Sequence, residues 1–184
     1  MSGDRFLIHD QNGIYFLTFT VVQWLDVFSR PSYKNIIVDS LNFCIERKGL
    51  VVFAWCLMSS HLHMIASAKD GFKLSEIIRD FKKFTAVSII QKIKEGPESR
   101  RELFLSEFLK AGLKDKRITN YKFWQESNHA IQLMGYETKI IDQKLQYIHQ
   151  NPVEQGIVAF PEDYLYSSAK DYADDKGLIQ VELL

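Results

Sequence analysis

Two histidines separated by one residue form the first pattern that could do chemistry. They are His61 and His63, in the run His61-Leu62-His63. Residues two apart on a strand point to the same side, so both imidazoles would project together while Leu62 turns to the other side. Two neutral imidazoles side by side can bind one divalent cation, and each then needs a further hydrogen-bond partner to fix its tautomer. Two structural histidines at the start of a strand have the same spacing, so the pair alone leaves both interpretations open.

A tyrosine and an asparagine four residues apart form the second pattern. Tyr147 and Asn151 lie in the run Tyr147-Ile148-His149-Gln150-Asn151-Pro152-Val153, and on a helix they share one face about one turn apart. A phenol can be a nucleophile, and an amide oxygen can bind a hard cation. Free tyrosine is a poor nucleophile because its pKa is about 10, but a metal that polarises a phosphodiester would make attack feasible. The structural alternative is a half-buried tyrosine followed by a helix-capping asparagine.

Cations and aromatic side chains form a third and weaker pattern. The cations suited to phosphate contacts are Arg79, Lys82 and Lys83. The aromatic residues that could stack on unpaired bases are Tyr121, Phe123 and Trp124. A solvated helix face and a core aromatic cluster would use the same residues, so this pattern does not decide the function.

The elements that must position these residues follow from hydrophobic spacing and turn signals. Buried strands are expected over residues 14–22, 50–58 and 61–68, with Ser59-Ser60 as the turn of a hairpin. Apolar residues at helical spacing predict helices over 33–48, 73–94 and 138–150. The stretch 101–111 is expected to form a short helix, and 117–133 to contain strand. Pro152 should end the last helix at Asn151. This order predicts an α+β fold in which helices pack on one largely antiparallel sheet.

Length and composition predict one ordinary domain over residues 1–184. The chain is 46% hydrophobic and 25% charged, which excludes wholesale disorder. Two cysteines are too few for a disulfide scaffold and indicate a reducing compartment. No apolar run reaches the roughly 18 residues of a membrane span, and the first ten residues lack a signal-peptide core. We therefore expect a soluble cytoplasmic protein without a membrane partner.

The net charge of zero hides an uneven distribution. Residues 73–117 carry twelve Lys and Arg against seven Asp and Glu, and residues 137–184 carry four against nine. A neutral chain does not coat nucleic acid by bulk attraction, but it can present a local basic stretch to a polyanion.

The motifs, taken together and in order, resemble the single-tyrosine HUH (His, hydrophobic, His) transposases. The strand over 51–58, Ser59-Ser60 and His61-Leu62-His63-Met64-Ile65 are similar to the HUH motif of that family. The later runs are similar to the REP-associated branch: Phe123-Trp124-Gln125, the Tyr147 run, Gly156, Tyr166-Ser167-Ser168-Ala169 and Asp171-Tyr172. The resemblance extends from about residue 14 to 172.

The resemblance implies a specific fold, site and reaction. The fold would be a ferredoxin- or RRM-like antiparallel sheet with helices. His61 and His63 would bind Mg²⁺ or Mn²⁺, with Asn151 as the third ligand and Gln150 as the alternative. Tyr147 would be the nucleophile of a transposase that cleaves and rejoins single-stranded, hairpin-forming DNA through a 5′-phosphotyrosine. Family members act as monomers or as homodimers, so both assemblies stay open.

Three alternatives accompany this interpretation. One is a domesticated hairpin-binding protein without strand-transfer activity. Another is a metal-dependent hydrolase, which would need a carboxylate that the sequence just after His61 does not offer. A zinc site built from Cys44, Cys56 and the two histidines is the third. Tyr136 is a second tyrosine near Tyr147, but it precedes the predicted helix and lacks the amide partner.

Overall fold

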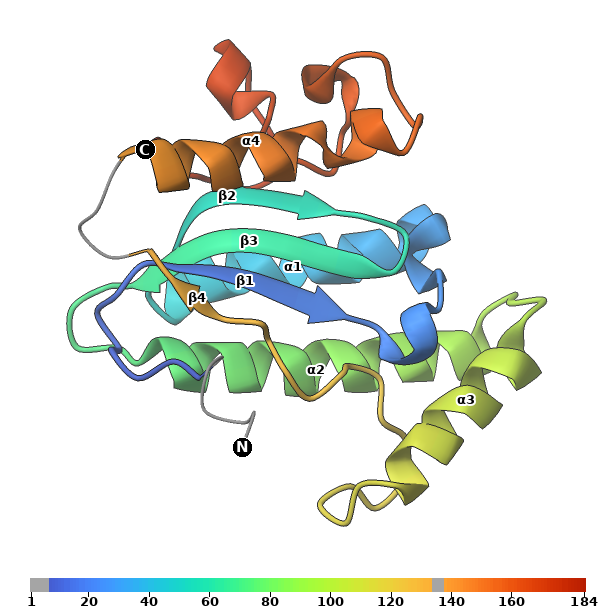
Figure 1. Ribbon diagram of the computed structural model, residues 1–184. Coiled ribbons are helices and arrows are strands. Elements are labelled where there is room, and N and C mark those ends of the chain that lie inside the picture. The colour runs from blue at the N-terminus through green and yellow to red at the C-terminus, as the bar shows by residue number, and fades with distance from the viewer. Residues whose placement is uncertain (1–6, 134–137) are drawn as a thin grey trace.

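A four-stranded antiparallel sheet forms the centre of the computed structural model, which describes residues 7–133 and 138–184 (Figure 1). The strand order is β2-β3-β1-β4. The strands are β1 (Tyr15–Thr20), β2 (Leu50–Leu57), β3 (His61–Ala68) and β4 (Ile131–Gln132). One helix lies between β1 and β2, and another follows β3. This order of strands and helices is that of a ferredoxin-like sheet, so the predicted α+β class is confirmed. Tyr136 lies outside the described residues.

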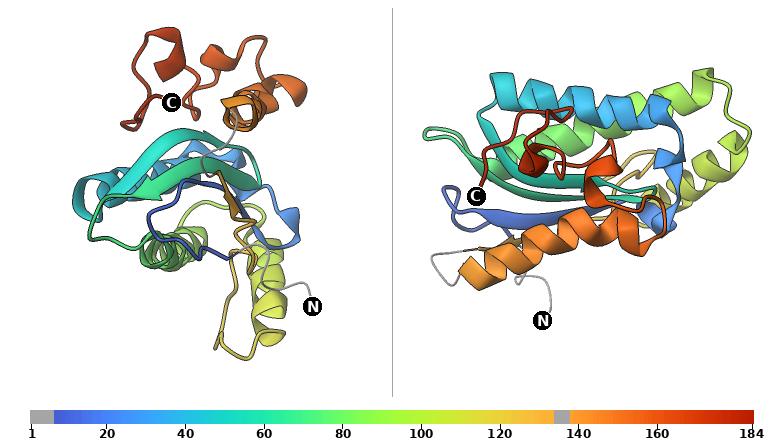
Figure 2. Two further views of the ribbon diagram at one scale, coloured as in Figure 1. Left: turned by 60° about the vertical axis from the view of Figure 1, so that its left-hand side comes forward. Right: turned by 90° about the horizontal axis from the view of Figure 1, so that it is seen from above.

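Helices cover the two faces of the sheet unequally. One face carries α1 (Pro31–Arg47) and α2 (Leu74–Glu95), while α4 (Thr138–Glu154) lies over the other (Figures 1 and 2). The short helix α3 (Arg101–Leu113) packs near the end of β1, against the turn Val22–Trp24. None of the helices among the described residues is long and apolar enough to cross a membrane.

Alternation along β1 and β3 assigns side chains to the two faces. Phe19 packs against Phe81 of α2, with ring centroids 5.9 Å apart. Thr18 pairs with His63 and Thr20 pairs with His61 across the two strands. Because directly paired residues share a face, both histidines and both threonines point toward α4.

Helix α4 is longer than the sequence predicts, since it continues through Pro152 to Glu154. Proline disfavours a helical residue before it and donates no backbone hydrogen bond. The backbone N–H groups that follow still find partners: Gln155 N donates to Asn151 O, and Ile157 N donates to Pro152 O. These bonds close the last turn, and the prediction that the helix ends at Asn151 is wrong.

The stretch 117–133 contains strand, as predicted, but only near its C-terminal end. Its only strand among the described residues is the two-residue β4, and Trp124 makes an isolated bridge to Val21. Two residues of this stretch nevertheless hydrogen-bond to β1: Gln125 N donates to Thr20 O, and Asn128 O accepts from Thr18 N. Irregular backbone thus covers the part of the β1 edge that β4 does not reach.

The C-terminal segment covers the outer edge of β2 (Figure 2). Leu57 N donates to Tyr166 O, and Ser168 N donates to Trp55 O. Farther along, Glu182 N donates to Val52 O. These bonds occupy backbone groups that an edge strand would otherwise leave open to pairing with other chains.

Candidate active site

The two histidines lie side by side on β3, on the sheet face that α4 covers. Their ring centroids are 4.7 Å apart, and both side chains are buried. The predicted projection of His61 and His63 to one side, with Leu62 on the other, is what the strand register produces. Alternation of a regular strand therefore suffices to bring the two imidazoles together.

Hydrogen bonds orient both rings through the same nitrogen. Ser60 Oγ lies 3.1 Å from His61 Nδ1, and Thr18 Oγ1 lies 2.9 Å from His63 Nδ1. His63 Nε2 is buried and has no hydrogen-bond partner among the described residues. A buried polar atom without a partner is costly, and a metal ion bound there would supply the missing partner. The donor set therefore fits a divalent cation held by the Nε2 atoms.

Burial keeps both imidazoles neutral, which is the form that binds metals. It lowers the pKa of His61 to about 4. The pKa of His63 falls to about 3, chiefly through burial and further because protonation of His63 is disfavoured beside the neighbouring His61 ring and the Lys144 ammonium. Neither ring has to lose a proton before it binds a cation at neutral pH.

Helix α4 brings Tyr147 to the same histidines within one chain. The phenol ring lies 5.1 Å from the His63 ring, centroid to centroid, and 44% of the tyrosine is exposed. Phe16 of β1 packs edge-on against Tyr147 at 6.1 Å. Lys144 Nζ lies 5.9 Å from the Tyr147 ring centroid and adds positive charge beside it. An accessible phenol, two neutral imidazoles and an ammonium group thus meet at one place.

Asn151 and Gln150 occupy different sides of α4. Asn151 is buried one turn after Tyr147, and its Oδ1 accepts a bond of 3.4 Å from Gln155 Nε2. No hydrogen bond among the described residues joins Asn151 to either imidazole. Gln150 instead lines a cavity of about 430 Å³ between α4 and the C-terminal segment, together with Gln146 and Pro161. Gln150 thus lines a cavity away from the histidine pair of β3, and the role of Asn151 as a third ligand stays a prediction.

A zinc site of four ligands does not form. Within residues 7–133 and 138–184, no group of three or more His, Cys, Asp and Glu residues could hold a metal ion. Cys44 is buried in α1 on the opposite side of the sheet. Burial raises the pKa of the Cys56 thiol to about 12, so this sulfur is a protonated core group.

Sequence comparison assigns the chain to a family. A family model described as "Transposase IS200 like" matches residues 15–151. The chain belongs to this family. No curated protein matches the sequence.

One solved structure shares the fold, and a second shows a weaker similarity. A REP-associated tyrosine transposase bound to a REP hairpin superposes with a TM-score of 0.64 at 17% identity, covering 99% of this chain and 92% of the other. A candidate transposase from Deinococcus radiodurans R1 superposes with a TM-score of 0.43 at 16% identity, covering 80% and 95%. The first similarity confirms the fold expected of a tyrosine transposase.

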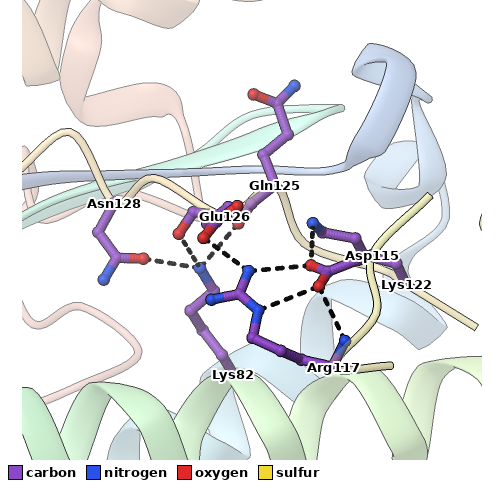
Figure 3. Close-up of polar contacts among 7 residues, drawn as sticks. All are labelled: Lys82, Asp115, Arg117, Lys122, Gln125, Glu126 and Asn128. Atoms are coloured by element: carbon purple, nitrogen blue, oxygen red, sulfur yellow. Dashed lines mark hydrogen bonds and ion pairs between the residues drawn. The ribbon is translucent and has the colours of Figure 1, made fainter. Parts of the chain in front are cut away.

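The three cations predicted to contact nucleic acid have different surroundings in this transposase-family fold. Lys82 Nζ donates to Gln125 O at 2.9 Å and to Asn128 Oδ1 at 2.7 Å (Figure 3). Burial lowers its pKa to about 8. Arg79 is exposed and bonds to Asp80, and Lys83 is exposed. Lys82 therefore holds the 125–128 segment beside β1, and a phosphate contact stays a prediction for Arg79 and Lys83.

The neighbouring cations of the basic stretch are also paired with acidic groups. Asp115 accepts from both Arg117 and Lys122, and Arg117 also bonds to Glu126 (Figure 3). The pKa of the Asp115 carboxyl lies far below its usual range because of these two cations. The local excess of positive charge is thus partly neutralised inside the fold.

Of the two interpretations left open for Tyr121, Phe123 and Trp124, the core aromatic cluster is the one that two of the three residues follow. Phe123 and Trp124 belong to the core, and Trp124 Nε1 donates to Thr85 Oγ1 at 3.0 Å. Tyr121 is half-buried with Lys94 Nζ 4.6 Å from its ring centroid. The tryptophan that is exposed is Trp24, beside His61.

Proposed function

We propose that the protein is an active DNA transposase that cuts and rejoins single-stranded DNA through Tyr147. The observation that carries the proposal is the convergence of an accessible phenol and two neutral imidazoles, one of them with a buried, unpartnered Nε2. Membership of the IS200-like transposase family supports the reaction class.

The metal would be Mg²⁺ or Mn²⁺, held by His61, His63 and the Asn151 amide oxygen. Such a cation, when bound, withdraws electron density from the scissile phosphate and makes it more susceptible to attack. The protein supplies the rest of the site: Thr18 and Ser60 fix the histidine rings through their Nδ1 atoms. Lys144 adds a positive charge near the phosphate position.

Tyr147 would act as the nucleophile of an in-line displacement. Its Oη forms a bond to phosphorus while the bond from phosphorus to the 3′-oxygen breaks. The phenol loses its proton, and the leaving 3′-oxygen takes one up. The product is a 5′-phosphotyrosine and a free 3′-hydroxyl, so another 3′-hydroxyl can reverse the step and join strands without ATP.

The substrate would be single-stranded DNA that folds into a hairpin. The similar REP-associated transposase is bound to a REP hairpin, and the neutral, partly paired surface of this chain suits a folded target better than bulk attraction to any strand. Because Tyr147 and both histidines come from one chain, catalysis within one subunit is expected whether or not the protein forms a homodimer.

The test is covalent capture of DNA by Tyr147. Purified protein with Mn²⁺ and a hairpin oligonucleotide with single-stranded flanks should give a protein–DNA adduct that survives a denaturing gel. Tyr147→Phe should abolish the adduct and retain DNA binding, while Tyr121→Phe, which changes a tyrosine outside the site, should form it normally. An equal adduct with Tyr147→Phe would refute the assignment. Binding without any adduct would favour the hairpin-binding protein instead.

A further inference from the structure

One aromatic side chain at the edge of the histidine pair is exposed without an evident structural purpose. Trp24 is 61% exposed, and its ring centroid lies 5.5 Å from that of His61. The other two tryptophans, Trp55 and Trp124, are buried. Tryptophan is usually well buried because its large ring gains much from leaving water, so its exposure beside the site needs an explanation.

The backbone at this position is held in a conformation that favours glycine. Gln23 and Trp24 both have positive φ, at 56° and 54°. A left-handed conformation is costly for residues with a side chain, and it persists where surrounding bonds impose it. Here Val21 N donates to Ser60 O, Val22 N to Phe123 O, and Trp24 N to Val21 O. The first bond ties the turn to Ser60, the residue before His61; the second ties it to Phe123, and the third closes the turn itself.

Burial of the indole does not offset the cost of this left-handed backbone, because the side chain stays in solvent. Strained residues of this kind concentrate at functional sites. The turn presents a large aromatic surface next to the nitrogen donors, and it is anchored by Ser60, which directly precedes β3, and by Phe123. This arrangement is what a fixed platform for a flat ligand group requires.

We propose that Trp24 stacks on a nucleobase of the bound single strand, next to the scissile phosphate. The inference rests on the proposed function, because the phosphate is placed at His61 and His63. A base is separated from its phosphate by one ribose, so a strand held at the histidines brings a neighbouring base to Trp24. Stacking on an aromatic ring is available to every base and contributes affinity without reading sequence.

The experiment measures how much the bases contribute to binding. Two probes are compared: oligothymidylate of about 16 nucleotides and an abasic oligomer with the same number of phosphates. The wild type should bind the oligothymidylate more tightly. Trp24→Ala should weaken binding of the oligothymidylate by about 5- to 100-fold and leave binding of the abasic oligomer unchanged. Trp24→Phe should retain most of the preference.

Phe84→Ala is the matched control. Phe84 is 62% exposed on α2, on the opposite side of the sheet, and its loss should not change the preference. A wild-type protein that does not distinguish the two probes, or a preference that Trp24→Ala leaves intact, would overturn the proposal.

A second variant separates stacking from a structural role. Trp24→Gly suits the left-handed backbone, so it should melt at the same temperature as the wild type or up to about 3 °C higher, while it loses the preference for bases. A clear loss of melting temperature would show that the indole supports the fold and would overturn the proposal.

The outcomes for Trp24 and for the proposed function are distinguishable. A Tyr147 adduct that forms normally, together with unchanged base preference in Trp24→Ala, removes only the stacking role. Base preference that depends on Trp24 without any adduct removes the strand-transfer reaction and keeps the stacking site.

Discussion

Substitution of Asn151, whose amide oxygen is the proposed third ligand, tests the proposed metal site most directly at the scale of single residues. We expect Mn²⁺ to raise the melting temperature of the wild type, because a ligand that binds only the folded state stabilises it. Asn151→Ala should weaken Mn²⁺ binding by roughly tenfold or more, while Gln150→Ala should leave it unchanged, since Gln150 lines a different cavity.

Calorimetric titration of both variants with Mn²⁺ checks this prediction, and the melting temperature without metal shows whether each variant is folded. His63→Ala provides the reference for a lost ligand. Equal affinity of Asn151→Ala and the wild type would remove Asn151 from the ligand set, and a loss confined to Gln150→Ala would put Gln150 in its place.

The buried imidazoles also make folding stability depend on pH. Burial lowers the pKa of His61 to about 4 and of His63 to about 3, from about 6.5 in an unfolded chain. As the pH falls below 6.5, the unfolded chain binds protons first, so the free energy of unfolding decreases. Each histidine contributes a slope of roughly 1.4 kcal/mol per pH unit until its folded-state pKa is reached.

Urea unfolding at pH 7 and pH 5, in EDTA, measures this slope. The double variant His61→Gln/His63→Gln should lose less stability between the two pH values than the wild type. His149 is present in both proteins, and burial lowers its pKa to about 4, so its contribution cancels. An identical loss would mean that the two rings are accessible to protons in the folded state.

At the scale of elements, two adjacent cations on α2 should have different roles: Lys82 should contribute to folding stability and Lys83 to DNA binding. Lys82→Met removes the bonds to Gln125 O and Asn128 Oδ1 and should lower the free energy of unfolding by about 1–3 kcal/mol. Lys83→Met changes an exposed side chain and should alter stability by less than about 0.5 kcal/mol.

Binding of single-stranded DNA should separate the same two variants. Lys83→Met is expected to weaken binding and to reduce the slope of log affinity against log salt by about 0.7. Lys82→Met should leave that slope unchanged, because its ammonium is already bonded within the fold. A reduced slope for Lys82→Met would show that Lys82 reaches phosphate after all.

Regular elements were predictable from sequence, and irregular segments were not. The bounds of β3 match the prediction because alternation and the Ser59-Ser60 turn are local signals. The end of α4 differs because later backbone bonds compensate for Pro152. The sequence left base stacking and core packing both open for Phe123 and Trp124, because the choice depends on the core around them, and the structure buries both.

The candidate site divides in the same way. The juxtaposition of His61 and His63 was predictable because alternation along a strand is a local signal, whereas the place of Tyr147 beside them was implied by the family resemblance; the structure brings the three rings together. Thr18 as the partner of His63 depends on the register between two distant strands. The exposure of Trp24 depends on a left-handed turn, and the sequence does not predict that turn because it contains no glycine there.

At the scale of the whole molecule, the C-terminal segment fixes α4 relative to the sheet. Ser168 Oγ accepts from Trp55 N at 3.0 Å and lies 2.9 Å from His149 Nε2. Tyr172 OH donates to Phe53 O at 2.9 Å, and its ring packs edge-on against His149 at 5.0 Å. One serine therefore links β2 to the helix that carries Tyr147, and the position of the phenol depends on a segment more than ten residues away.

Ser168→Ala should accordingly weaken both the fold and the reaction. We expect a loss of about 1–3 kcal/mol in the free energy of unfolding, because the buried Trp55 backbone and the half-buried His149 ring lose their bond, and a slower formation of the Tyr147 adduct with less change in DNA binding. Ser106→Ala, which removes an exposed hydroxyl bonded within its own helix, is the control. A double-mutant cycle of Ser168→Ala with His149→Ala measures their coupling in stability and in adduct rate. Strictly additive effects would show that Ser168 acts on β2 alone and that α4 is positioned by other contacts.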